Sequence, residues 1–190
     1  MESTTSNFTG DVPGNYDRHL GPNIFHAHAD DLVGRVDVED GSTVLELAAG
    51  TGIVSRRLRD ALPRGAGLIV SDLNGPMLDV ARDKFSGGEA VTFEVIDALS
   101  LPFEEDTIDA IVCQFGVMFY PDKQQAYREA LRVLKPGGVF LFNAWGSLDA
   151  NPFARLAHEV GEDFFPDDAP TFYKVPFGYH APETGLGELR

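Results

Sequence analysis

A glycine-rich segment between two structured stretches is the part of the sequence best suited to hold a ligand. Residues 46–52 (ELAAGTG) follow a short apolar run, and a helical pattern begins directly after them. Glycines here let the backbone turn tightly and let a ligand approach where a Cβ would obstruct it. The helix start then presents free N–H groups toward the bound molecule. Because ordinary turns and helix starts also use glycine, the segment predicts a site only together with its context.

The carboxylate that completes this context is Asp72. It ends the next apolar run, about 20 residues after Gly52, which is the offset expected of a ribose-binding acid. Its two oxygens can accept hydrogen bonds from both ribose hydroxyls. The alternative is that Asp72 caps the following helix, but Asn74 is better placed to do so. We therefore expect Asp72 to bind a ribose.

The charges near this segment distinguish between adenosine-containing cofactors. The third glycine of a dinucleotide motif, which packs helix against strand around a pyrophosphate, is Ser55 here. Glu46, Asp72 and Asp97 all follow or end predicted strands, so their carboxylates converge at one edge of the sheet. Such charges repel a pyrophosphate but suit a sulfonium and an ammonium. The sequence thus favours S-adenosylmethionine over a nicotinamide dinucleotide.

Strand and helix patterns alternate over 43–144, which is typical of a parallel α/β sheet. Helices are expected after Pro22, after Gly52, at Asn74 and at Pro121, and 135–138 (KPGG) should end the last of them. The inner face of this last helix is expected to carry Tyr127, Ala130, Leu131 and Leu134. A further helix is expected over 152–160. The expected strands are 43–47, 68–70, 91–96, 108–114 and 139–143.

These elements suggest three parts of the chain. We expect 1–14 to be a flexible tail and 15–146 to be the cofactor-binding domain. The aromatic-rich segment 147–190 either covers an apolar acceptor or packs on the sheet as a satellite cluster, and the sequence does not decide between the two.

Four motifs occur in the order seen in class I S-adenosylmethionine-dependent methyltransferases: 44–52 (VLELAAGTG), 71–78 (SDLNGPML), 97–103 (DALSLPF) and 134–138 (LKPGG). The chain most resembles the ubiquinone/menaquinone-biosynthesis type and its small-molecule relatives, over about 16–145. The resemblance implies a Rossmann-like, doubly wound parallel sheet with strand order 3-2-1-4-5.

The resemblance also implies cofactor-binding roles, carried over by position. Glu46 would order the glycine loop and face the methionine part, and Asp72 would bind the ribose. Tyr16 would close over the cofactor. The residues concerned are Tyr16, Glu46, Ala48, Gly50, Gly52, Asp72, Leu73, Met77, Asp97, Ala98, Gln114 and Phe115.

The remaining members of this set divide between the two ends of the cofactor. Leu73 and Met77 would pack on the adenine, and Asp97 with the Ala98 backbone would read its edge. Gln114 and Phe115 would lie near the methyl group. Leu73 and Met77 are equally consistent with ordinary core packing, and for Phe115 core packing is favoured over a role in the site.

The sequence identifies no catalytic base. Methyl transfer from a sulfonium is an in-line displacement, which positioning and desolvation can accelerate. His19, His26, His28 and His180 are candidates, with surface or capping roles as the alternative. His26 and His28 would point in different directions on a helix, so no metal site is expected.

Composition limits the partners. A formal charge of −15 argues against nucleic acids and anionic membranes, which reward clustered cations, and favours a small-molecule acceptor. No apolar run reaches membrane-spanning length, so we expect no membrane insertion and a cytoplasmic location. The single cysteine, Cys113, lies among apolar residues and is expected to be buried and inert.

The chain departs from the family after the fifth strand. The family core continues with a helix and two more strands, whereas this sequence ends at 187–190. The chain is expected to be a fragment or a short form that lacks those strands. Its fifth strand, with Phe140 and Phe142, would then be an exposed edge that invites homo-oligomer formation.

These observations favour methyl transfer to a small organic acceptor, at oxygen or carbon, of quinone-like or phenolic type. The missing strands keep open a non-catalytic S-adenosylmethionine-binding or interaction module. A nicotinamide-dependent oxidoreductase is disfavoured by Ser55 and the carboxylates.

Overall fold

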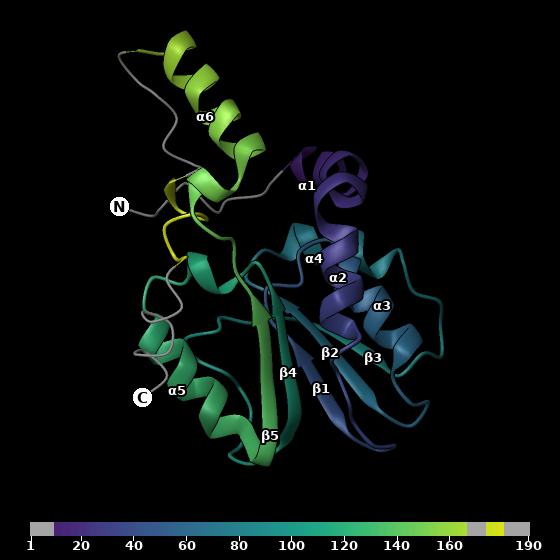
Figure 1. Ribbon diagram of the computed structural model, residues 1–190. Coiled ribbons are helices and arrows are strands. Elements are labelled where there is room, and N and C mark those ends of the chain that lie inside the picture. Colours follow the sequence, from purple (N-terminus) through teal and green to yellow (C-terminus); the bar gives the residue numbers. More distant parts are fainter. Residues whose placement is uncertain (1–9, 167–173, 181–190) are drawn as a thin grey trace.

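The fold is a five-stranded parallel sheet covered by helices on both faces (Figure 1). The computed structural model describes residues 10–166 and 174–180. The strand order is β3-β2-β1-β4-β5, as predicted, and every pairing is parallel. The strands are β1 (Thr43–Glu46), β2 (Gly67–Asp72), β3 (Val91–Val95), β4 (Ile108–Gln114) and β5 (Leu134–Asn143).

Alternation along the central strands builds two hydrophobic cores. In β1, Val44 and Leu45 are both fully buried but belong to different clusters, because successive side chains point to opposite faces. Val44 belongs to the same cluster as Leu58 of α3, and Leu45 belongs to the same cluster as Ala130 of α5. Each large aliphatic side chain buried in this way contributes roughly 1.5–3 kcal/mol. Burial on both faces explains the apolar runs in the central strands β1 and β4.

The helices divide between the two faces. α2 (His26–Val33), α3 (Ile53–Ala61) and α4 (Gly75–Arg82) cover one side, and α5 (Lys123–Val133) covers the other, as Figure 1 shows. α6 (Pro152–Phe164) projects beyond the sheet. Short helices are α1 (Val12–Asn15), η3 (Val117–Phe119) and η4 (Leu148–Ala150). No helix in the described part of the chain is long and apolar enough to cross a membrane.

The N-terminal region is helical earlier than predicted. A π-helix, η2 (Tyr16–Phe25), precedes α2 and contains Pro22, so the expectation that the helix begins after Pro22 is wrong. α1 also makes a helical turn within the segment expected to be a tail, while 1–9 lie outside the described residues.

The junction of α5 and β5 also differs from the prediction. Tyr127 and Ala130 of α5 face the core as predicted, together with Ala126, but Leu131 is 74% exposed, so its inward placement was wrong. Leu134 pairs with Ile108 as the first residue of β5. Residues 135–138 therefore form an irregularity within the strand pairing, where the sequence predicted only a helix stop.

Within the described residues β5 is an edge strand, as expected. Phe140 and Phe142 are half-buried beneath Tyr127 of α5 and contribute to the core on that face. Homo-oligomer formation through this edge stays a prediction, which sedimentation velocity would test.

Candidate cofactor site

The glycine loop connects β1 to α3 in a conformation that depends on left-handed residues. Gly50 and Gly52 have φ of 57° and 79°, and Ala48 has φ of 52°. A Cβ on Gly52 would lie 2.8 Å from the Cβ of Ala81 in α4, closer than nonbonded carbons approach. Glycine at 52 therefore permits both the turn and the close packing of α4.

Asp72 connects the end of β2 to this loop. Its Oδ2 accepts a hydrogen bond from the Gly50 backbone N–H at 2.8 Å. Its Oδ1 accepts from the Asn74 backbone N–H at 2.8 Å and from Asn74 Nδ2 at 3.2 Å. Asn74 occupies the N-cap of α4 but makes no side-chain capping bond, contrary to expectation. Oδ2 accepts only one hydrogen bond and keeps acceptor capacity that a hydroxyl group can use.

Glu46 is a carboxyl group buried at the base of the loop. It is only 1% exposed, and its Oε2 atom has no hydrogen-bond partner. Burial raises the pKa of Glu46 to about 8; the nearby Ser55 hydroxyl lowers the pKa, and the Asp72 carboxylate raises it. Gln114 Oε1, at the end of β4, is a second buried oxygen without a partner. These two oxygens can receive a cation or hydrogen-bond donors.

The end of β4 is fitted closely to the glycine loop. Phe115 has φ of 51°, an uncommon conformation for a bulky residue. A Cβ on the next residue, Gly116, would lie 2.5 Å from the Ala48 Cβ and 2.6 Å from Cys113 Sγ. Phe115 stacks on Trp145 with ring centroids 3.9 Å apart and an interplanar angle of 2°.

The N-terminal helix η2 is held against the loop by Asp17. Asp17 Oδ1 accepts a hydrogen bond from Thr51 Oγ1 at 2.7 Å and also pairs with Lys84, after α4. The preceding residue, Tyr16, stacks on Phe25 with ring centroids 5.0 Å apart. Burial raises the pKa of the Tyr16 hydroxyl, and Asp72 adds to the rise. We call the contacts of Asp17 with Thr51 and Lys84 the Asp17 latch.

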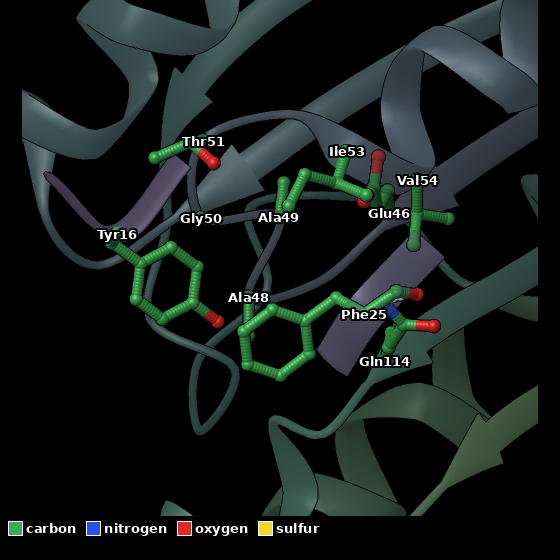
Figure 2. Close-up of a pocket in the computed structure, with 10 residues that line it drawn as sticks. All are labelled: Tyr16, Phe25, Glu46, Ala48, Ala49, Gly50, Thr51, Ile53, Val54 and Gln114. Carbon is green, nitrogen blue, oxygen red and sulfur yellow. Dashed lines mark hydrogen bonds between the residues drawn. The ribbon is translucent and has the colours of Figure 1, made fainter. Parts of the chain in front are cut away.

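These elements enclose a cavity of about 660 Å³, within the range of small-molecule sites. A smaller pocket of about 30 Å³ adjoins it around the glycine loop (Figure 2). Glu46 lines the small pocket, and Tyr16, Ala48, Gly50 and Gln114 line both. The predicted residues that line the large cavity are Tyr16, Ala48, Gly50, Asp72, Leu73, Met77, Asp97, Ala98, Gln114 and Phe115.

The predicted residues are not equivalent within this arrangement. Gly52 lines neither space and acts through the backbone of the loop. Met77 is buried and Leu73 is 62% exposed, although both face the large cavity. Asp97 is exposed, and its Oδ1 accepts from the Leu99 N–H at 2.9 Å.

Sequence reasoning missed several residues around the site. Asn74 and Lys123 line the large cavity, and Asp17 holds η2 to the loop. Only tertiary proximity reveals Asp17, because its partner Thr51 is 34 positions away. Of the aromatic segment after β5, only Val175 among the described residues reaches the cavity; Phe172 and Tyr173 lie outside the described residues.

None of the candidate histidines lines either space. His28 makes edge contacts with Phe115 and Trp145, at 5.2 and 5.4 Å between ring centroids. Cys113 is fully buried, and burial raises its thiol pKa to about 11, as expected for an inert thiol. Among the described residues, the lining of the two spaces therefore offers positioning and charge but none of the histidines considered as a base.

The geometry fits S-adenosylmethionine better than a dinucleotide. The unpartnered Glu46 and Gln114 oxygens suit an ammonium and a sulfonium, while Asp72 retains acceptor capacity for ribose hydroxyls. A parallel sheet of order 3-2-1-4-5 with this loop and these carboxylates defines the Rossmann-like class I methyltransferase fold. Residues 45–142 match the model of the methyltransferase domain family. The chain belongs to this family, whose cofactor is S-adenosylmethionine.

Curated relatives give the same assignment. The chain is 40% identical over 98 residues to the demethylmenaquinone methyltransferase of Clavibacter sepedonicus, covering 52% of this chain and 39% of the relative. It is 32% identical over 126 residues to the ubiquinone/menaquinone biosynthesis C-methyltransferase UbiE of Hahella chejuensis, covering 65% and 50%. The chain thus spans half or less of the length of these relatives.

Solved structures share the fold. A chain in the complex between the Haloferax volcanii Trm112 methyltransferase activator and a putative methyltransferase matches with a TM-score of 0.67 and 25% identity, covering 93% of this chain and 69% of that one. A putative S-adenosylmethionine-dependent methyltransferase of Methanococcus maripaludis matches with a TM-score of 0.65 and 20% identity, covering 87% and 78%.

Proposed function

We propose that this chain transfers a methyl group from S-adenosylmethionine to carbon or oxygen of a small aromatic acceptor of quinone-like or phenolic type. The observation that carries the proposal is the pair of buried, unpartnered oxygens of Glu46 and Gln114 beside Asp72. Burying such groups without partners is unfavourable, so a cationic ligand that satisfies them gains affinity from their desolvation.

The residues around the cavity have separate tasks in this proposal. When bound, S-adenosylmethionine supplies a methyl group for in-line displacement by the acceptor. Asp72 holds the ribose, and Glu46 with Gln114 orients the positively charged methionine part. Phe115 and Tyr16 exclude water from the reacting centre. Positioning of this kind can supply much of the rate acceleration without a dedicated base.

The acceptor class is supported by the relatives and by the walls of the cavity. The curated relatives are named for demethylmenaquinone and for ubiquinone and menaquinone biosynthesis. The β4 side of the cavity carries Met118, Phe119 and Tyr120, which suit a flat apolar ring. The alternative of a non-catalytic binding module is not favoured, because those relatives are named as enzymes. A cytoplasmic location stays a prediction.

Calorimetric titration of the purified chain with S-adenosylmethionine, S-adenosylhomocysteine and NADH tests the first step. We expect micromolar binding of both adenosyl ligands and none of NADH. Absence of adenosyl binding by a folded chain would overturn the proposal. A panel of quinols and catechols, with methylated product detected by mass spectrometry, then tests transfer; binding without turnover would favour the non-catalytic alternative.

A further inference from the structure

The large cavity has opposite charges on its two halves. Among the described residues that line it, the charged side chains are Asp72, Asp97 and Lys123. Asp72 ends β2 and Asp97 follows β3, on one side of the central strand β1. Lys123 lies beyond β4, on the other side. The cofactor's ribose and adenine belong to the acidic half, so the lysine lies on the half left for the acceptor.

Lys123 has no carboxylate partner among the described residues, although the chain has 30 acidic and 15 basic residues. By contrast, Lys84 pairs with Asp17 and Lys135 pairs with Asp109. The Lys123 ammonium donates one hydrogen bond, to the Tyr120 carbonyl oxygen at 2.9 Å. An ammonium has three donors, so capacity remains for a ligand.

Lys123 lies at a helix position where a lysine without a carboxylate partner is electrostatically unfavourable. It is the first residue of α5, where the partial positive charge of the helix end disfavours a cation. Asp122 caps that end by accepting from the Gln125 N–H at 2.9 Å, and Asp122 forms no ion pair with Lys123. A lysine at this position therefore contributes little to the stability of α5. Both the helix N-terminus and the Lys123 ammonium carry positive charge, so together they favour binding of an anion nearby.

The surroundings of Lys123 hold its ammonium in place and suit an aromatic ligand. Nζ lies 5.0 Å from the ring centroid of Tyr179, whose hydroxyl hydrogen-bonds to Tyr127 at 2.9 Å. Phe119 and Pro121 line the same part of the cavity. A ring packed on these side chains would place an acidic substituent next to the ammonium.

We propose that Lys123 binds an anionic oxygen of the acceptor, so that the preferred acceptors are aromatic rings bearing a carboxylate or an acidic enol or phenol. This inference rests on the proposed function and specifies its substrate class. Lys123 acts in binding and specificity, with no part in the methyl displacement itself.

Binding to the chain saturated with S-adenosylhomocysteine tests the proposal with two matched pairs of probes. One pair is 3,4-dihydroxybenzoate and the neutral 3,4-dihydroxybenzamide. The other is 2-hydroxy-1,4-naphthoquinone, an acidic enol, and the neutral 2-methoxy-1,4-naphthoquinone. We expect the wild-type chain to prefer the anion in at least one pair by about 10-fold or more, as one charge-assisted hydrogen bond provides. The pair that shows the preference identifies carboxylate or enolate as the source.

Three variants test whether Lys123 causes the preference for the anionic probe. Lys123→Met should abolish it, and Lys123→Arg should keep most of it. Lys174→Met removes the same charge from an exposed lysine outside the cavity lining and should change nothing. If no anionic probe is preferred, or if the preference survives in Lys123→Met, the inference is wrong.

The affinity for S-adenosylhomocysteine separates this inference from the proposed function. All three variants should bind it within about twofold of the wild-type chain, which also shows that they are folded. Failure of the wild-type chain to bind S-adenosylhomocysteine would instead overturn the proposed function.

Discussion

Asp72 Oδ2 accepts a hydrogen bond from the backbone N–H of Gly50 at 2.8 Å, so the carboxylate that ends β2 also fixes the glycine loop that follows β1. A ribose-binding acid needs only to face its ligand. Here the same group also holds the backbone of the glycine loop, which lines the same cavity. Loss of Asp72 should therefore affect ligand affinity and loop order together.

Asp72→Ala should weaken S-adenosylhomocysteine binding by roughly 10-fold to several hundred-fold, through lost charge-assisted hydrogen bonds and a less ordered loop. Calorimetric titration measures the change. Asp79→Ala, at an exposed position of α4 outside the cavity lining, is the matched control and should bind normally. Unchanged affinity in folded Asp72→Ala would remove the ribose assignment.

The raised pKa of Glu46 predicts a pH dependence of stability. Between its ordinary value of 4.5 and about 8, the unfolded chain has lost the Glu46 proton while the folded chain retains it. The contribution of Glu46 to the free energy of unfolding should be full below pH 4.5 and should fall as the pH rises through about 8. Denaturant unfolding across this window measures the slope.

Glu46→Gln should remove that part of the slope, because the amide does not titrate. Glu39→Gln, at an exposed position, is the matched control and should leave the slope of the wild-type chain unchanged. The same slope in both variants would mean that Glu46 is ionised in the folded chain at neutral pH.

Gly52→Ala should destabilise the chain by about 2 kcal/mol or more, because the new Cβ demands a left-handed alanine and overlaps Ala81. Ala81→Gly in the same chain should recover only part of this loss, because the Ala81 Cα also lies 3.0 Å from the new Cβ and a glycine weakens α4. Gly87→Ala meets nothing within 4 Å, has no positive φ, and should change stability by less than about 0.5 kcal/mol. A neutral Gly52→Ala variant would contradict the observed loop geometry.

Asp17→Ala should release the Asp17 latch and raise amide hydrogen exchange across η2. The affinity for S-adenosylhomocysteine should fall by about 5-fold, the size of one ordinary hydrogen bond. Asp31→Ala in α2 breaks an exposed ion pair with Arg35, which follows that helix, and serves as control. If exchange in η2 were equal in both variants, the latch would not hold the helix.

Most of the sheet followed from the sequence because each predicted strand is a short apolar run before a polar or glycine-containing turn. β4 was predicted at its observed bounds, and the motif order implied the strand order. The helix expected at Pro121 is α5, and its inward residues Tyr127 and Ala130 were predicted correctly, whereas Leu131 was not. Leu134 is buried as expected but belongs to β5, and Ala126 takes the remaining place on the buried side of the helix.

The N-terminal helix could not be placed from the sequence, because Pro22 lacks an amide donor and usually ends or begins a helix. In η2 the proline sits within a π-type turn, whose longer hydrogen-bond spacing accommodates it. The contacts of Asp17 with Thr51 and Lys84 join segments distant in the chain. No local sequence pattern encodes such contacts. The residues that line the cavity could therefore largely be predicted, whereas the contacts that hold η2 against the glycine loop could not.

The Asp17 latch should affect how long a ligand stays bound as well as how tightly it binds. Tyr16 lines both the cavity and the small pocket, and the latch fixes the helix that carries it against the glycine loop. If Tyr16 covers a bound ligand, as proposed, the ligand would leave when those contacts open. The residence time of an adenosyl ligand would then depend on Asp17 as well as on the residues that line the site.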